Sequence, residues 1–232
     1  MSTPPSGRDG PHIFVPDLDT LEVDSDDRHH LARVLRLRPG DPLTAGDGAG
    51  AWRPCRFGDR LEATGPVIVV PPNPFRLTVG FAIIKGGRPE LIVQKLTELG
   101  IDDIVPFIAE RSVVRWDDEK RAANRRRWQR VAREAAMQSR QVWLPDIEPV
   151  GEIGAAAARP GATLAERGGP APSEAVRTIL IGPEGGWSDA ERSIAPHVGL
   201  PGGVLRAETA AIVAGTILAA RRGSDRAADL DG

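Results

Sequence analysis

Two short segments near the carboxyl end of the chain place the strongest constraint on its fold. Residues 179–191 read ILIGPEGGWSDAE: an apolar run, a glycine-rich turn, and an S-x-x-E pattern from Ser188 that predicts a capped helix start. Residues 204–211, VLRAETAA, repeat the plan, with a brief strand at 204–205, a polar turn and an apolar helix over 209–222. We therefore predict two neighbouring turns at the carboxyl ends of parallel strands, where open α/β sheets bind ligands.

The residues of these turns limit the ligand they can hold. Glycine lets backbone groups approach a ligand closely, and a helix start attracts phosphate. A P-loop, however, needs a lysine directly after its glycines, whereas here Trp187 follows and Glu184 would repel a phosphate. A neutral or cationic ligand with a flat ring suits the turns, and S-adenosylmethionine has this chemistry. A tight turn without any ligand is the alternative, because an isolated glycine motif is a weak signal.

The two motifs together are more specific than either alone. GPEGG-x-S-x-x-E followed by LRAETA resembles the RsmE family, the small-subunit ribosomal RNA uracil-N3 methyltransferases of the SPOUT, or α/β-knot, superfamily. Other pieces agree, namely HHLARVLRLRPGD, KGGRPELIVQKLTELGI, an Arg-Ser pair at 111–112 and EAxxQ from Glu134. The resemblance implies a SPOUT-type α/β trefoil-knot methyltransferase domain preceded by a small PUA-like β-barrel domain.

The composition fits a protein of the cytoplasm, and the net charge of −2 does not by itself indicate nucleic-acid binding, so the distribution of charge is more informative. The 232 residues are 41% apolar and 27% charged, without an apolar run that could span a membrane or serve as a signal core. The single cysteine, Cys55, fits a reducing compartment. Residues 76–145 carry 14 basic and 9 acidic side chains, a net charge of +5, whereas both flanking segments are acidic. RNA binding requires such a local basic surplus.

The first domain is expected to span residues 1–72, with residues 1–10 disordered because they are polar and rich in glycine and proline. Short strands broken by turns predict a small β-barrel, which by resemblance helps to bind RNA. The arginines of a helix that begins at Ser25 either contribute to RNA binding or form a solvated face, which is commoner for charge runs. The predicted strands are residues 12–15, 42–45, 51–57, 61–64 and 67–70.

The second domain is expected at residues 76–224, followed by a tail at 225–232. Its helical patterns alternate with buried strands, which indicates a parallel α/β sheet. Pro106 suits its strand only where the adjacent edge is unpaired or bulged. The last helix is apolar nearly all round, and the resemblance implies a homodimer through the C-terminal knot helices. The predicted strands are 76–84, 104–109, 162–165 and 178–181, and the predicted helices are 90–99, 117–139 and 152–159.

By resemblance, three loops bind S-adenosylmethionine, mainly through backbone groups. Glu184 and Glu208 are candidates for the base that removes a proton from the target, a role that water can also fill. Either could instead hold the amino group of the cofactor or cap a helix, the commoner task of such carboxylates. Arg206 completes the candidate catalytic set, as a phosphate ligand or a partner of a glutamate. The candidate cofactor-binding residues are Leu164, Ala165, Gly182, Pro183, Glu184, Gly185, Gly186, Leu205, Arg206, Ala207, Glu208, Thr209 and Ala210.

A second set of side chains is expected to contact RNA. Arg111 is the first candidate, and an ion pair with Glu110 or another nearby acid is the alternative. Three departures from the family pattern leave roles open: Gly87 and Met137 replace common acidic residues, and the usual Gly-Arg appears as Arg140-Gln141. No Cys/His cluster occurs in the sequence, so we expect no metal site. The candidate RNA-binding residues are Lys85, Arg88, Lys95, Arg111, Arg115, Gln138 and Arg140.

The resemblance implies methylation of N3 of one uridine, U1498 of the 16S ribosomal RNA, within the small ribosomal subunit. Two rival functions remain. One is a SPOUT methyltransferase that acts on another RNA atom, such as a tRNA ribose 2′-oxygen; the predicted barrel and the KLTELG–RS–EAxxQ series argue against it. The other is a non-enzymatic RNA-binding assembly factor, which the intact glycine turns disfavour.

Overall fold

The computed structural model describes residues 3–84, 88–112, 114 and 116–228. The chain forms two compact units, one made of Met1–Pro74 with Arg133–Leu144 and the other of Phe75–Ala132 with Pro145–Gly232. The first unit therefore contains a segment that returns to it after more than fifty residues, which a boundary near residue 72 did not anticipate. Among the described residues, no helix is long and apolar enough to cross a membrane.

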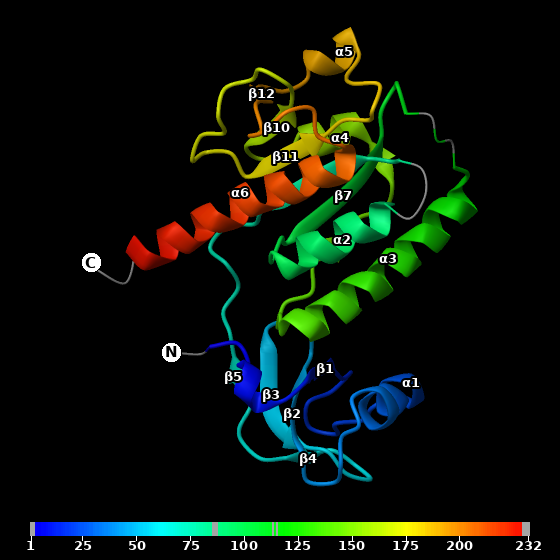
Figure 1. Ribbon diagram of the computed structural model, residues 1–232, viewed down its shortest axis with the longest axis vertical. Coiled ribbons are helices and arrows are strands. Elements are labelled where there is room, and N and C mark those ends of the chain that lie inside the picture. Colours follow the sequence, from blue (N-terminus) through cyan, green and yellow to red (C-terminus); the bar gives the residue numbers. More distant parts are fainter. Residues whose placement is uncertain (1–2, 85–87, 113, 115, 229–232) are drawn as a thin grey trace. The chain divides into compact units, whose positions relative to one another are not determined.

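The first unit is built on a five-stranded sheet (Figure 1), and every strand predicted for it forms. The pairings run along an open path from β1 to β4 rather than around a closed ring. The first two strands are parallel, and the other pairs are antiparallel. The strands are β1 (His12–Phe14), β2 (Pro42–Gly46), β3 (Ala51–Arg56), β4 (Glu62–Ala63) and β5 (Ile68–Val69), with β5 paired to β3.

The returning segment completes the core of the first unit. Met137 packs against a buried cluster that includes Leu31 and Leu43. Arg133 donates from Nη2 to Oδ2 of Asp27 at 2.5 Å and to the carbonyl of Phe14 at 3.0 Å. Met137 and Arg133 belong to α3 (Asp118–Ser139). The residues of this helix up to Ala132 belong to the second unit, and those from Arg133 onward belong to the first.

Two predictions for the first unit were wrong. Residues 3–10 are ordered: Gly7–Asp9 form a 3-10 helix capped by Ser6, and the Thr3 carbonyl accepts a 3.0 Å hydrogen bond from Trp52 Nε1. The helix predicted from Ser25 is shorter and is capped one residue earlier. It comprises α1 (Ser25–His29) and a π-helical turn (His30–Val34), and the side chain of Asp24, not Ser25, accepts from the amide of Asp27.

The second unit contains a seven-stranded sheet in which every pairing is parallel, which confirms the predicted α/β arrangement. The strand order is β12-β10-β11-β6-β7-β8, and β9 also pairs with β7. The strands are β6 (Thr78–Ala82), β7 (Asp103–Ile108), β8 (Asp146–Ile147), β9 (Gly151–Glu152), β10 (Ala162–Ala165), β11 (Thr178–Ile181) and β12 (His197–Val198).

Both faces of this sheet are buried, which explains its nearly continuous apolar strands. Ile179 and Ile181 of β11 face one core, and Leu180 between them faces the other. Helices α2 (Arg88–Glu98) and α6 (Ala207–Ala228) lie side by side over the first core (Figure 1). Helix α4 (Ile153–Ala157) packs over the second core.

Proline in β7 meets the predicted condition. β7 pairs with β8 through Asp103 and Ile104, and with β9 through Phe107 and Ile108. Pro106 lies between these two short pairings, and on the other side it is aligned with Phe81 of β6. The missing amide therefore falls where the described strands make no ladder bond on that edge.

Two predictions near the carboxyl end need correction. Residues 204–205 do not form a strand: Val204 is 84% exposed, and the preceding strand is β12. Helix α6 begins at Ala207 and continues to Ala228, past the end expected at residue 222 and into the expected tail. Helix α5 (Asp189–Arg192) begins after Ser188, as predicted.

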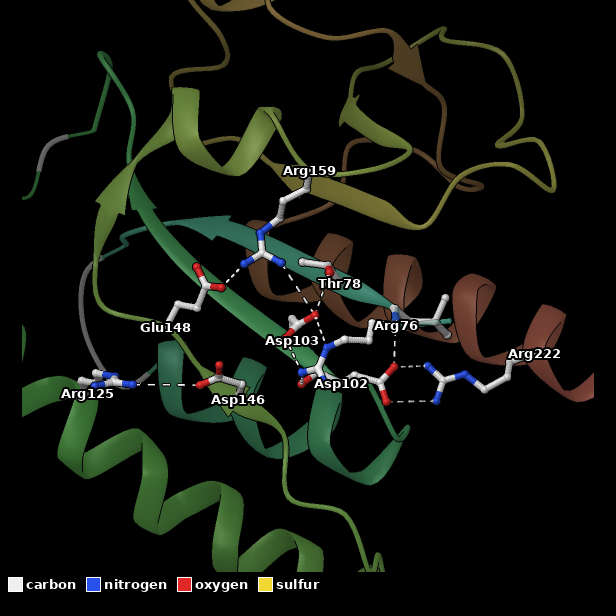
Figure 2. Close-up of polar contacts among 10 residues, drawn as sticks. Arg76, Thr78, Asp102, Asp103, Arg125, Asp146, Glu148, Arg159 and Arg222 are labelled. Carbon is white, nitrogen blue, oxygen red and sulfur yellow. Dashed lines mark hydrogen bonds and ion pairs between the residues drawn. The ribbon is translucent and has the colours of Figure 1, made fainter. Parts of the chain in front are cut away.

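A network of ion pairs occupies the amino ends of the strands (Figure 2). Arg222 of α6 contacts Asp102 at 2.5 Å, and Arg76 contacts Asp103 at the same distance. Arg159 also pairs with Asp103, at 3.7 Å. Because all strands are parallel, this network lies at the opposite end of the sheet from the turns that follow the strands.

Candidate functional site

The carboxyl ends of three parallel strands bring together loops that are far apart in the sequence. β10 ends at Ala165, β11 leads into the glycine turn at 182–186, and β7 leads into the turn that carries Arg111. In the sheet, β11 lies next to β10, and β6 separates β11 from β7. The candidate residues therefore gather at one edge of the sheet, the edge at which open α/β sheets bind ligands.

The glycine turn has a defined shape. Gly186 donates to the carbonyl of Pro183 at 2.9 Å and has a φ of +69°, a conformation that favours glycine. At Gly182 a Cβ atom would lie 3.0 Å from the ring of Trp187. The backbone of this turn is therefore pressed onto the indole, and it leaves Glu184 and Gly185 exposed.

Trp187 links the turn to β7 and to the end of β10. Its side chain is buried and stacks on Phe107 of β7, with ring centroids 6.1 Å apart and an interplanar angle of 17°. Its Nε1 donates to the carbonyl of Ala165 at 2.9 Å. One indole thus sets the position of the glycine turn relative to the end of β10.

Charged side chains link the turns as well. Arg111 donates from Nη1 to the carbonyl of Gly185 at 3.2 Å. Arg88 pairs through Nη1 with Glu184 at 3.2 Å and through Nε with Glu208 at 3.7 Å. The two motifs, separated by about twenty residues, therefore meet at one guanidinium, as the prediction of neighbouring turns requires.

The cluster formed by Arg88, Glu184 and Glu208 has one more negative than positive charge. Oε2 of Glu208 is buried and has no hydrogen-bond partner within the described part of the chain, although a buried polar atom without a partner is costly. Exposed backbone groups beside a surplus carboxylate suit a cationic ligand better than a phosphate. No group of three or more metal-ligating side chains occurs among the described residues.

The family comparisons agree with this geometry. Residues 71–219 match the RNA methyltransferase domain family, and residues 23–60 match the RNA methyltransferase PUA domain family. The chain belongs to the RNA methyltransferase family. It is therefore an enzyme of this class, and the predicted resemblance, the α/β methyltransferase fold and the PUA-like first domain are confirmed.

Relatives of this RNA methyltransferase share most of its length. The chain is 33% identical to ribosomal RNA small subunit methyltransferase E of Mycobacterium tuberculosis, over 86% of each chain. It is 27% identical to the protein of that name from Bacillus subtilis, over 86% of this chain and 90% of the relative. A crystal structure of the Neisseria gonorrhoeae enzyme of that name, bound to S-adenosyl methionine, superposes with a TM-score of 0.73 and 26% identity, over 90% of this chain and 96% of that one.

The structure places the predicted cofactor-binding residues of this methyltransferase in different environments. Leu164 is fully buried in the core, so only its backbone is available for a ligand. Leu205 is half-buried against the larger core, whereas Arg206 and Thr209 are exposed. Ala210 donates to the carbonyl of Arg206 at 2.8 Å, which closes the first turn of α6.

Several of the predicted RNA-binding side chains already have partners in the chain. Lys95 contacts both carboxylate oxygens of Glu98 at 2.8 Å. Arg140 donates to the carbonyl of Gly10 from Nε and Nη2. Arg111 contacts a carbonyl rather than an acid. Gln138 is exposed, and Lys85, Arg115 and the Gly87 departure lie outside the described residues.

The sequence did not indicate two residues that shape this site. In the sequence, Trp187 argues only against a P-loop, and Phe107 is only part of a predicted strand. Their stacking joins β7 to the glycine turn, across residues that are eighty positions apart. An aromatic residue directly after a glycine turn and an aromatic residue near the end of a strand are the signals that could have suggested this contact.

Proposed function

We propose that the chain methylates N3 of one uridine in the 16S ribosomal RNA, U1498 by resemblance, and uses S-adenosylmethionine as the methyl donor. The observation that carries the proposal is the Arg88 guanidinium, which joins the carboxylates of the two turns into one site. The relatives' names supply the small-subunit RNA as the substrate class, and the gonococcal structure supplies the cofactor.

The residues present fit this cofactor. The glycine turn exposes backbone donors and acceptors, and the cluster around Glu208 has a surplus negative charge beside them. S-adenosylmethionine, when bound, supplies an electrophilic methyl group on a sulfonium. The turns at 182–186 and 205–210 hold and orient it, so that the methyl group lies in line with N3 of the target base.

Proton removal from N3 is assigned to Glu208. As the N3–carbon bond forms and the sulfur–carbon bond breaks, the N3 proton passes to Oε2 of Glu208, the buried oxygen without a partner among the described residues. Glu184 is 48% exposed and Glu208 only 13%, so Glu208 is the carboxylate better shielded from water. Arg88 holds both carboxylates in place, and Arg206 neutralises a phosphate of the bound RNA.

Substrate contacts and assembly are part of the proposal. Arg111 and Gln138 are exposed and contact RNA directly, whereas Lys95 and Arg140 would exchange chain partners for RNA. Arg88 keeps its two carboxylates and is not assigned to RNA. The protein acts on the small subunit in the cytoplasm as a homodimer formed through α6. The half-buried side chains of Ile212, Val213 and Ile217 support this dimer, because they add to the apolar surface of that helix. The molar mass in solution tests it.

The decisive experiment is mass spectrometry of small-subunit RNA from a strain that lacks the gene, before and after incubation with the protein and S-adenosylmethionine. We expect one 3-methyluridine and a stop in reverse transcription at that position, because an N3 methyl group blocks base pairing. A ribose methyl group, or a tRNA product, would support the rival RNA methyltransferase instead. Absence of cofactor binding in calorimetry would support the non-enzymatic assembly factor.

A further inference from the structure

The carboxylate of Glu191 makes more contacts than a helix cap requires. Glu191 is the third residue of α5 and is 6% exposed. Its Oε2 accepts from the amide of Ser188 at 2.9 Å, and the Ser188 hydroxyl accepts from the amide of Glu191 at 3.2 Å. These two bonds complete the predicted capping box, and only one of the two carboxylate oxygens takes part in them.

The second oxygen reaches a different loop. Oε1 of Glu191 accepts from the amide of Glu110 at 2.7 Å, although the two residues are 81 positions apart. Glu110 begins the turn that follows β7, and Ser112 closes that turn. The Ser112 hydroxyl accepts from the amide of Ala109 at 3.1 Å. A buried carboxylate thus fixes the backbone on one side of Arg111, and a buried serine fixes it on the other.

Arg111 is held directly against the glycine turn. Its guanidinium donates to the carbonyl of Gly185, and its own Cβ would lie 3.3 Å from a Cβ built on Gly185. The side chain of Arg111 therefore lies against the backbone of the glycine turn. Glu191 is the buried side chain that hydrogen-bonds both to the amide of Glu110, in the arginine-bearing turn, and to the amide of Ser188, two residues after the glycine turn. A bond from an amide to an ionised carboxylate is stronger than a neutral one.

We propose that Glu191 is a positioning residue for RNA recognition: it fixes the turn of residues 109–112 against the glycine turn, so that Arg111 meets the RNA beside the bound cofactor. The inference rests on the proposed function, because it takes Arg111 as an RNA contact. It goes beyond the capping role, since a cap needs neither the second oxygen nor Glu110.

The test compares two changes in the same capping box. Glu191→Gln keeps the shape of the side chain but can accept from only one of the two amides. Ser188→Ala removes the other half of the box and leaves the carboxylate intact. Both variants should unfold at a lower temperature than the wild type. Only Glu191→Gln should raise the dissociation constant for small-subunit RNA, by about tenfold at fixed salt. The kcat at saturating RNA and the cofactor dissociation constant should stay within about threefold of wild type, because Trp187 holds the glycine turn independently.

A double-mutant cycle separates positioning from general loss of stability. Arg111→Met removes the RNA contact, so Glu191→Gln added to it should change RNA binding by less than about twofold. Should Glu191→Gln fail to fold, Glu191→Asp replaces it, because the shorter carboxylate can serve the cap without reaching Glu110.

The inference is overturned if Ser188→Ala weakens RNA binding as much as Glu191→Gln does, or if the effects of Glu191→Gln and Arg111→Met multiply. These outcomes differ from a failure of the proposed function. A wild-type protein that shows the expected binding pattern but leaves the RNA unmethylated would overturn the methylation proposal alone.

Discussion

Glu208 is the residue whose chemistry most directly tests the proposed reaction. Glu208→Gln keeps the size of the side chain but removes its ability to take a proton from N3. We expect kcat to fall by about a hundredfold or more, with little change in the cofactor dissociation constant. Single-turnover methylation and calorimetry measure the two quantities. Glu184→Gln is the matched control, since Glu184 is more exposed and should have a smaller effect. Weaker cofactor binding with normal kcat would instead assign Glu208 to the amino group of the cofactor.

Trp187 offers a test of the contact between the glycine turn and Ala165, at the end of β10. Trp187→Phe keeps an aromatic ring against Phe107 but removes the hydrogen bond to the Ala165 carbonyl. Loss of about 1 kcal/mol from this bond should weaken cofactor binding about fivefold in calorimetry. Trp128→Phe is the control. Trp128 is equally buried, but its Nε1 has no hydrogen-bond partner in the described part of the chain. Equal losses of affinity in both variants would contradict the role assigned to the hydrogen bond.

For single side chains, the sequence predicted contacts between residues close in the chain well and contacts between distant residues poorly. The Ser188 cap could be read from spacing alone, because its partners are three residues away. The bond from Glu191 to Glu110 depends on which loops the sheet places together, and spacing carries no information about that. The partners of Arg111 and Arg88 were likewise set by tertiary neighbours: Gly185 for the first, and two glutamates for the second.

Among the secondary structure elements, those with a clear apolar pattern were predicted, whereas residues 204–205 and the end of α6 were not. The buried strand Thr178–Ile181 and the long helix Asp118–Ser139 follow their apolar patterns closely. The strand predicted at residues 204–205 rests only on two adjacent apolar residues, and in the structure Val204 is exposed. The sequence predicts that the last helix ends at residue 222, before a glycine, but α6 continues to Ala228 because glycine alone does not end a helix.

Helix α6 is anchored by an ion pair whose strength can be tested. Arg222 contacts Asp102 (Figure 2), and the two side chains are only 10% and 14% exposed. Asp102 also accepts from the amide of Leu77. Arg222→Met removes the ion pair and the bonds that Arg222 donates to Asp102, and it should lower the free energy of unfolding by about 3 kcal/mol. Arg76→Met is the control, because Arg76 is 62% exposed and Asp103 keeps Arg159. Urea unfolding measures both. Equal losses in the two variants would contradict the distinction between buried and exposed pairs.

For the whole molecule, the sequence predicted two domains but not how the chain is shared between them. The proline-rich stretch near residue 72 lies close to Pro74, where the first unit's opening segment ends. The return of residues 133–144 could not be predicted, because it depends on contacts such as that between Arg133 and Asp27, 106 positions apart. Apolar periodicity assigned α3 as one helix and gave no reason to divide its residues between two cores.

Because the two units have separate cores, a buried group in one can make that unit sensitive to acid. His12 in the first unit is 3% exposed, and its Nδ1 lies 2.8 Å from the Thr44 hydroxyl. Burial, with a smaller effect from the charge of Arg140, lowers the pKa of His12 to about 4. The unfolded chain, with a pKa near 6.5, therefore binds this proton more tightly than the folded one. The stability of the first unit should be complete above pH about 6.5 and fall by about 3 kcal/mol as the pH drops to about 4.

His12→Asn tests this dependence, because its amide can still reach Thr44 but does not titrate in this range. We expect the variant to lose most of the pH dependence of unfolding in that window, as measured by urea unfolding at a series of pH values. His30→Asn is the matched control: this histidine of the same unit is exposed, and its replacement should leave the dependence unchanged. A wild-type protein whose first unit is equally stable at both ends of the window would show that His12 accepts a proton without loss of structure, which its burial beside Phe14 argues against.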